Sequence, residues 1–553
     1  MGQTPRVLVV TYDVVGPRMA GPGIRAWEFA RALGTHFPTT LAAPAPVPTS
    51  GPGFAIAAIS GDFRSIDQLL ALIEQADIVV TQILPLHALA DRALEGKHLV
   101  VDLYCPWILE NLAHDRTAAQ GDDEWLMRDL KHVEALLARG DFFICASEKQ
   151  RDYWLGALVL AGRLTEAVYA SGADGRTLID TVPFGLSVEP PAYTKPVLKG
   201  VRPGIGREDF VALWGGGLWD WLDPLTLVRA TARLRDAGYP IRTVFLGTQR
   251  PLTSHASDQP PAMVERTRTL SGDLGLTDAQ VFFNDDWVPY AERANYLLEA
   301  DVGISLHMET LETRFAFRTR LLDYLWAGLI PVMGEGDALS ETIANVDAGR
   351  IVAGGDDEGL AQTIATLIDA PEKRAELAAN GRRLAESLTW GRVARPLIEY
   401  CRRPWRGDAV RGAGLVGLTA DLTTTHQDLT ATLLDLTETL LNAGEATAYA
   451  ARLEADLTTT HQDLTATLLD LTETLLNAGE ATAYAARLEG ELAVKNQHIA
   501  EQAAYAARLE GELAVKNQHI AEQAAYIAHL ECTVRASGVA RAIRARLPGR
   551  RRD

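Results

Sequence analysis

Two arginines and an aspartate lie close together in the segment RTRLLDYLWAGLIPV, residues 318–332. Its apolar pattern predicts a helix that ends at Gly328 and leads into a strand. Arg318 and Arg320 would lie just before this helix, with Asp323 in its first turn. A helix N-terminus already attracts anions, so the added cations suit a diphosphate, and the carboxylate one turn later could accept hydrogen bonds from a ribose. An ordinary buried helix and strand with incidental arginines is the alternative.

The elements that would position these residues alternate between strand and helix in two successive rounds. Helical patterns separate the strands, as in a doubly wound α/β fold. We therefore predict two Rossmann-like domains, residues 1–190 and 200–403, with a ligand site in the cleft between them. The apolar runs that predict buried strands are residues 6–10, 77–80, 98–102 and 141–146 in the first round, and 210–214, 241–246, 281–283, 302–306 and 350–352 in the second.

The 318–332 segment resembles the donor-nucleotide motif of GT-B glycosyltransferases of the family-four kind. That motif has Lys or Arg, Leu, any residue, Glu or Asp, and Tyr, followed by Ala-Gly-x-Pro-Val; here Ile330 adds one residue to the last spacing. The resemblance implies the α/β GT-B fold, with an N-terminal acceptor domain and a C-terminal nucleotide-sugar donor domain. It also implies transfer of a sugar from a nucleotide-sugar donor, and a helix near residues 390–400 that crosses back to the first domain.

On the donor side, the resemblance implies contacts from the glycine-rich segment WGGGLWDWLDPLTL and from strand ends near it. The basic pair that family members carry after this segment is absent here, and Asp220 and Asp223 stand in its place. Phosphate charge would then be met by Arg318, Arg320 and backbone amides. The expected donor-binding residues are Gly216, Gly217, His307 and Asp323.

Catalysis, by the same resemblance, would depend on stabilising the charge of the departing diphosphate, which in that family is thought to act as the base itself. Arg318 and Arg320 would supply this stabilisation. Glu312 would reach the transferred sugar, although strict family spacing puts that carboxylate at the position of Phe315; a solvated loop carboxylate is the alternative. We expect a retaining, metal-independent reaction with no cofactor beyond the nucleotide-sugar co-substrate.

On the acceptor side, a Gly- and Pro-rich loop at residues 16–23 follows the first predicted strand. Small residues there let backbone amides approach a ligand. Gly21, Gly23 and Arg25 are the expected contacts, with phosphate of donor or acceptor, and a simple tight turn is the alternative. Asp102 ends a predicted strand, where its carboxylate could bind an acceptor hydroxyl or cap a helix.

The composition narrows the class of protein. The chain has 553 residues, 47% of them hydrophobic, which suffices for two or three domains with substantial cores. A formal net charge of −19 argues against a general nucleic-acid binder. The four cysteines are far apart, and no apolar run approaches membrane-spanning length. We therefore predict a cytoplasmic protein, with peripheral contact at the inner face of the membrane left open.

Sequence repeats follow a Gly- and Arg-rich linker at residues 404–419. The segment 420–454 recurs unchanged directly after itself, and a second unit, 490–510, also occurs twice in succession with almost no change. Both periods are whole numbers of heptads, which predicts a coiled coil over residues 420–535 that forms a homo-oligomer; a loosely helical tail is the alternative. The basic end, residues 536–553, would touch anionic lipid or simply aid solubility.

Together these features favour a glycosyltransferase that takes part in assembly of a bacterial cell-surface polysaccharide or glycoconjugate, with a glycan or lipid-linked acceptor. Two alternatives remain open. One is a non-catalytic GT-B-like scaffold whose coiled coil mediates assembly, which the missing basic pair favours. The other is a nucleotide-sugar 2-epimerase of GT-B form, which would need only the sugar nucleotide as substrate.

Overall fold

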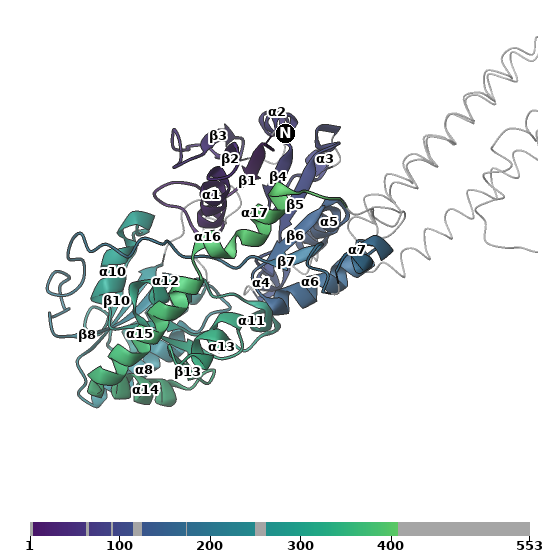
Figure 1. Ribbon diagram of the computed structural model, residues 1–553. Coiled ribbons are helices and arrows are strands. Elements are labelled where there is room, and N and C mark those ends of the chain that lie inside the picture. The colour runs from purple at the N-terminus through teal and green to yellow at the C-terminus, as the bar shows by residue number, and fades with distance from the viewer. Residues whose placement is uncertain are drawn as a thin grey trace, which may run out of the picture. The chain divides into compact units, whose positions relative to one another are not determined.

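A computed structural model of the chain describes residues 4–61, 66–89, 92–113, 124–172, 174–248 and 262–406. The predicted coiled coil at 420–535, the basic tail at 536–553 and all but the first three residues of the 404–419 linker lie outside these ranges. Within them the chain forms two parallel β-sheets with helices between most of the successive strands (Figure 1). The prediction of two doubly wound α/β halves is therefore confirmed.

The first sheet has seven strands in the order β3-β2-β1-β4-β5-β6-β7. The order reverses between β1 and β4, which pair in parallel although β2 and β3 come between them in the sequence. This reversal is the switch point at which open α/β sheets bind ligands. The strands are β1 (Val7–Val10), β2 (Thr39–Pro44), β3 (Ala55–Ile59), β4 (Ile78–Thr81), β5 (His98–Asp102), β6 (Phe142–Cys145) and β7 (Ile179–Thr181).

Helices connect the successive strands of the first sheet except β2 and β3, which are joined by a loop (Figure 1). The first of them, α1 (Gly21–Gly34), begins with Pro22 in its first turn, where a missing backbone N–H costs nothing. It buries Phe29 and Leu33 against the sheet. The others are α2 (Asp67–Gln75), α3 (Leu86–Leu89), α4 (Trp107–Ala113), α5 (Glu124–Arg139), α6 (Glu148–Leu160) and α7 (Glu166–Ser171).

The second sheet has six strands in the order β10-β9-β8-β11-β12-β13, with its switch point between β8 and β11. Its strands are β8 (Phe210–Gly217), β9 (Ile241–Gly247), β10 (Val281–Phe283), β11 (Val302–Ser305), β12 (Ile330–Gly334) and β13 (Arg350–Val352). Its helices are α8 (Pro224–Asp236), α9 (Ala262–Asp273), α10 (Arg293–Glu299), α11 (Leu311–Phe315), α12 (Arg320–Ala327), α13 (Ala338–Asn345), α14 (Asp357–Asp369) and α15 (Pro371–Ser387).

Two segments connect the halves. The first leads from β7 to β8, and the second returns through α16 (Trp390–Val393) and α17 (Arg395–Arg402). They are joined by backbone hydrogen bonds from the Leu186 amide to the Leu388 carbonyl (2.8 Å) and from the Trp390 amide to the Leu186 carbonyl (3.0 Å). The Tyr400 ring of α17 stacks on Phe142 of β6, with centroids 4.5 Å apart. The final helix thus packs on the first sheet, as the resemblance implied.

None of the helices in the described ranges is long and apolar enough to cross a membrane.

Candidate functional site

A cavity of about 440 Å³, called here the central cavity, lies between the carboxyl ends of the two sheets. The first half contributes residues that follow β1 and β5, among them Gly21, Tyr104 and Glu110. The second half contributes the end of β8, the loop after β10 and the start of α12. Residues after β1 and at the end of β8, one strand of each switch point, line this space, so the fold places the cavity where parallel sheets bind ligands. A second cavity, of about 480 Å³, lies behind α12 and is lined by none of the predicted site residues.

Arg320 is the first residue of α12 and lies on the wall of the central cavity. Its Nη2 donates to the Gly217 carbonyl (2.9 Å), and its guanidinium lies 4.8 Å from the centre of the Trp214 ring. Nη1 is buried and has no hydrogen-bond partner among the described residues. Burial lowers the pKa of Arg320 to about 10, so the side chain is still charged at neutral pH. A cation held this way suits an anionic ligand.

Arg318, by contrast, is already neutralised. It donates from Nη1 and Nη2 to the two carboxylate oxygens of Glu312, at 2.9 and 2.6 Å, and both side chains are buried. The structure thus brings two of the predicted catalytic residues together as an ion pair. Arg318 lines the central cavity, whereas Glu312 does not. Contact between Glu312 and a sugar would require this pair to separate.

Asp323 lies one turn along α12 from Arg320, and its side chain is 38% exposed on the cavity wall. It accepts a hydrogen bond from Nε of Arg293 (3.1 Å). Three arginines line the central cavity, and two of them, Arg293 and Arg318, have carboxylate partners. Within the part of the chain that the structure describes, Arg320 is the member of this set that no carboxylate pairs with.

The glycines at 215–217 form the end of β8 with a bulge, where the sequence pattern predicts a separate tight turn. The Tyr324 hydroxyl of α12 accepts from the Gly215 amide (2.8 Å) and donates to the Ile304 carbonyl (2.9 Å). Gly216 has a φ of +115°, which disfavours other residues. A Cβ at Gly247 would lie 2.6 Å from the Gly216 carbonyl carbon. Two strand ends therefore approach each other closely and present bare backbone to the cavity.

His307 lies behind the cavity wall. It is 3% exposed, and its Nε2 lies 2.9 Å from the Glu335 carbonyl, which makes Nε2 the donor. Burial, with the positive charge of Arg318 adding to it, lowers the pKa of His307. The ring is thus neutral at pH 7. His307 does not line the central cavity, so the structure does not bring it together with Gly216, Gly217 and Asp323.

The two aspartates that replace the expected basic pair act as helix caps. Asp223 accepts from the Thr226 amide (3.1 Å) at the start of α8. Asp220 accepts from the Met263 amide (3.0 Å) in the first turn of α9. An N-terminal cap of this kind typically contributes about 1 kcal/mol. The charges that the sequence places near a phosphate site are therefore used to fix helices.

The acceptor-side residues Arg25 and Asp102 also form a buried pair. Nε and Nη2 of Arg25 donate to the Asp102 carboxylate at 2.6 and 2.8 Å, and Nη2 also donates to the Val182 carbonyl (2.7 Å). The guanidinium lies 4.7 Å from the centre of the Tyr104 ring. Arg25 and Asp102 do not line the central cavity, but Tyr104 does. In this arrangement the pair supports the cavity wall from behind.

The two predicted glycines of α1 differ in role. Gly21 lines the central cavity, and a Cβ there would lie 3.7 Å from the Tyr104 hydroxyl. Gly23 faces inward, where a Cβ would lie 2.2 Å from the Val14 carbonyl oxygen. Gly23 is therefore required for packing of α1 against the preceding loop and does not line the cavity.

Sequence reasoning missed several cavity residues. Cys105 and Glu110 line it from the first half, and the Cys105 thiol donates to Glu110 Oε2 (2.9 Å). Burial, followed by the nearby Glu110 charge, raises the pKa of Cys105 well above its usual value. Arg293 and Trp287 line the cavity from the second half. The sequence signal for these residues was their position, because they follow the ends of the strands β5 and β10.

No family model matches the sequence. Over 202 residues the chain is 26% identical to the D-inositol 3-phosphate glycosyltransferase of Rhodococcus erythropolis. That match covers 36% of this chain and 42% of the relative, so the chain spans less than half the length of the curated relative it matches.

The solved structures named here match this chain over nearly the whole of their own length. Sucrose-phosphate synthase from Thermosynechococcus elongatus has a TM-score of 0.55 and 16% identity, over 72% of this chain and 98% of that one. Anabaena HepE in complex with UDP and glucose has a TM-score of 0.51 and 16% identity, over 72% and 100%. Trehalose-6-phosphate synthase has a TM-score of 0.52 and 12% identity, over 73% and 100%. At these identities the likeness shows the fold. The protein has the GT-B fold.

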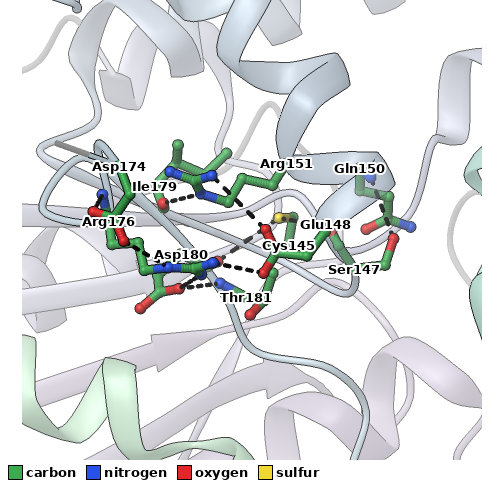
Figure 2. Close-up of polar contacts among 10 residues, drawn as sticks. All are labelled: Cys145, Ser147, Glu148, Gln150, Arg151, Asp174, Arg176, Ile179, Asp180 and Thr181. Atoms are coloured by element: carbon green, nitrogen blue, oxygen red, sulfur yellow. Dashed lines mark hydrogen bonds and ion pairs between the residues drawn. The ribbon is translucent and has the colours of Figure 1, made fainter.

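Figure 2 shows a polar network of the first half at the start of α6. One of its residues, Gln150, also contacts the second half of this GT-B fold. Ser147 caps α6 by accepting from the Gln150 amide (3.2 Å), and Arg176 pairs with Glu148 (2.8 Å). From this fixed turn, Gln150 Nε2 donates to the Phe315 carbonyl of α11 (2.8 Å). Because α11 also carries Glu312, the network holds the buried Glu312 pair in place from the first half.

Within the described ranges, no group of three or more His, Cys, Asp or Glu side chains is arranged to hold a metal ion.

Proposed function

We propose that the protein is a glycosyltransferase that moves a sugar from a nucleoside diphosphate sugar to an acceptor in the central cavity. The observation that carries this proposal is Arg320, a buried cation on the cavity wall beside the bare backbone of residues 215–217. Its Nη1 has no hydrogen-bond partner among the described residues. The match to a curated glycosyltransferase supports it, as does the likeness to a GT-B structure with UDP and glucose bound.

The diphosphate would lie over the end of β8. There the Gly216 and Gly217 backbone can approach it closely and Nη1 of Arg320 can donate to it. As the sugar bond breaks, negative charge grows on the departing diphosphate, and a cation already fixed in position stabilises that charge without reorganising. In keeping with the family resemblance, we propose a retaining, metal-independent reaction in which the departing diphosphate itself takes the acceptor proton. The acceptor would enter from the first half, past Gly21, Tyr104 and Glu110.

The cellular role rests on sequence features. We propose a glycan or lipid-linked acceptor and a part in assembly of a bacterial cell-surface polysaccharide or glycoconjugate. The heptad repeats at 420–535 support homo-oligomer formation, and the arginines within 536–553 support peripheral contact with the inner face of the membrane from the cytoplasm.

Loss of the Arg320 charge tests the function. Nucleoside diphosphates (UDP, GDP and ADP) and their glucose and mannose derivatives are titrated calorimetrically against the protein and against Arg320→Gln. A hydrogen bond to a charged group contributes about 1.5–3 kcal/mol. We therefore expect the variant to bind the preferred diphosphate about 10- to 100-fold more weakly.

Arg374→Gln is the matched control. Arg374 lies over Phe210 at the other end of β8, 5.3 Å from the ring centre, and donates to backbone carbonyls of α14, so its replacement should leave nucleotide affinity unchanged. A folded wild-type protein that binds none of these compounds would contradict the proposal and favour the scaffold. Conversion of a bound sugar nucleotide to its 2-epimer without acceptor would favour the epimerase.

A further inference from the structure

Arg293 occupies an unusually constrained position on the wall of the central cavity. Its Nη1 donates to the Tyr290 carbonyl (2.8 Å), and its guanidinium lies 3.7 Å from the centre of the Tyr290 ring. The Trp326 ring lies on another side, 4.7 Å from the guanidinium carbon. With two aromatic rings and a carbonyl around it, the guanidinium keeps one orientation, and it points Nε at Asp323.

The Asp323 carboxylate is only partly used by this contact. Oδ1 accepts from Arg293 Nε at 3.1 Å, and Oδ2 receives no hydrogen bond from the described residues. The side chain is 38% exposed at the cavity and lies one turn from Arg320 on the same helix. A carboxylate in this position can accept hydrogen bonds from two neighbouring hydroxyl groups, while its charge is balanced by the guanidinium behind it.

The constraint on Arg293 comes partly from outside the second half. The Tyr290 amide donates to the Pro17 carbonyl of the first half (2.9 Å). The Trp326 indole donates to the Glu189 carbonyl in the connecting segment (2.8 Å). The backbone of Tyr290 and the ring of Trp326 are therefore held by carbonyl groups of segments outside the second half.

We propose that Arg293 is a positioning residue that holds the Asp323 carboxylate oriented toward a vicinal diol, so that the site selects ribonucleotides over 2′-deoxyribonucleotides. The inference rests on the proposed function, because the diol is that of the donor ribose. An oriented carboxylate makes both hydrogen bonds to the diol without first losing rotational freedom. Without Arg293 the carboxylate would be free to rotate into water, and the second hydroxyl would add little affinity.

The test compares paired ligands on full-length protein. UDP and 2′-deoxy-UDP, GDP and 2′-deoxy-GDP, and ADP and 2′-deoxy-ADP are titrated calorimetrically, and the ribose preference is the ratio of dissociation constants for the pair that binds best. We expect wild type to prefer the ribonucleotide by at least about tenfold, or about 1.4 kcal/mol. Arg293→Met keeps the apolar stack but removes the charge and donors, and it should reduce the preference to less than about threefold.

Three variants complete the design. Asp323→Asn should lose the preference as Arg293→Met does, and Arg293→Lys should restore part of it. Arg202→Met is the matched control, because Arg202 lies 5.5 Å from the Phe282 ring centre and donates to the Phe283 carbonyl, away from the central cavity. It should leave the preference unchanged.

The outcomes separate the two proposals. If wild type binds none of the nucleotides, the proposed function fails and the inference falls with it. If wild type shows the preference and Arg293→Met weakens both members of a pair equally, leaving the ratio unchanged, the function stands and Arg293 has only a structural role. A melting temperature for each variant shows that it is folded.

Discussion

At the scale of single residues, the partners of the buried charged side chains distinguish compensated ion pairs from a cation that is left for a ligand. Arg25 pairs with Asp102, and Arg318 pairs with Glu312, in both cases through two hydrogen bonds in buried surroundings. Charges in such pairs are already compensated, so they contribute rigidity more than binding. Arg320 differs because its partner in the described part of the chain is a backbone carbonyl, which leaves its positive charge for an anion.

Replacement of Asp102 by Asn tests how much the first pair contributes to stability. The change leaves the Arg25 charge buried without a counter-charge, which typically costs about 3–5 kcal/mol, so we expect a clear fall in the melting temperature. Asp77→Asn is the control, because Asp77 pairs with Arg6 at the surface, where side chains are 48% and 56% exposed. Exposed pairs contribute about 0–1 kcal/mol. Equal effects of the two substitutions would show that burial does not decide the value of the pair.

At the scale of elements, α12 and the end of β8 act as one unit. Arg320 holds the Gly217 carbonyl, and the Tyr324 hydroxyl bridges β8 and β11 from the next turn of the same helix. The helix ends at Gly328, whose φ of +69° favours glycine, and the chain then enters β12. A single eight-residue helix therefore fixes the cation, the bare backbone of β8 and the Asp323 carboxylate relative to one another.

Removal of one hydroxyl tests this coupling. Tyr324→Phe leaves the Gly215 amide and the Ile304 carbonyl without their partner, at a cost of about 1–3 kcal/mol. We expect weaker binding of the preferred nucleoside diphosphate as well as a lower melting temperature. Tyr239→Phe removes a surface hydroxyl that donates to Asp369 and should change both by little. A Tyr324→Phe protein that is destabilised but binds nucleotide normally would show that the β8 end keeps its shape unaided.

At the scale of the whole molecule, the segment that returns to the first half through α16 links the wall of the central cavity to the hydrophobic core. Trp390 is buried against Phe29 and Phe184, with ring centroids 5.8 and 5.0 Å away. A Cβ at Gly185 would lie 2.7 Å from the Trp390 ring, so the connecting segment is pressed against this side chain. Phe184, Gly185 and Leu186 also line the central cavity and are called here the cavity floor. Trp390 packs behind these residues and therefore supports them.

Trp390→Ala should therefore be among the most damaging single changes. Truncation of a buried tryptophan typically costs about 3–5 kcal/mol, and here the cavity floor loses its support as well. We expect a large fall in melting temperature and a loss of nucleotide affinity in the protein that remains folded. Tyr169→Ala, at a ring that is 76% exposed, should have little effect on either quantity. Normal nucleotide affinity in Trp390→Ala would show that the cavity floor does not depend on it.

The sequence predicts those features that a local pattern can carry. Apolar runs predict β1, β4, β5 and β6 to within about one residue, because strands buried on both faces need such runs. The alanine-rich β2 and β3 were missed, since their pattern fits a helix or a loop equally well.

The candidate site shows the same limit. Spacing alone grouped Arg320 and Asp323 on one helix. The partner of each charge, however, depends on tertiary neighbours: Asp102 lies 77 positions from Arg25, and Arg293 lies 30 positions from Asp323. A sequence pattern therefore located α12 but could not show that Arg25, Asp102 and Glu312 are already engaged, or that Asp220 and Asp223 serve as helix caps.

The last described residue, Arg406, bonds to the Asp141 carboxylate and the Lys97 carbonyl, beside the amino ends of β5 and β6. The central cavity opens at the carboxyl ends of the same strands. Residue 406 therefore lies at the end of the first sheet opposite the proposed chemistry. The sequence repeats begin only after this residue, so a change in the number of repeat units leaves the sequence that forms the cavity unchanged. The length of the repeat region and the chemistry of the central cavity can consequently evolve as separate properties of one polypeptide.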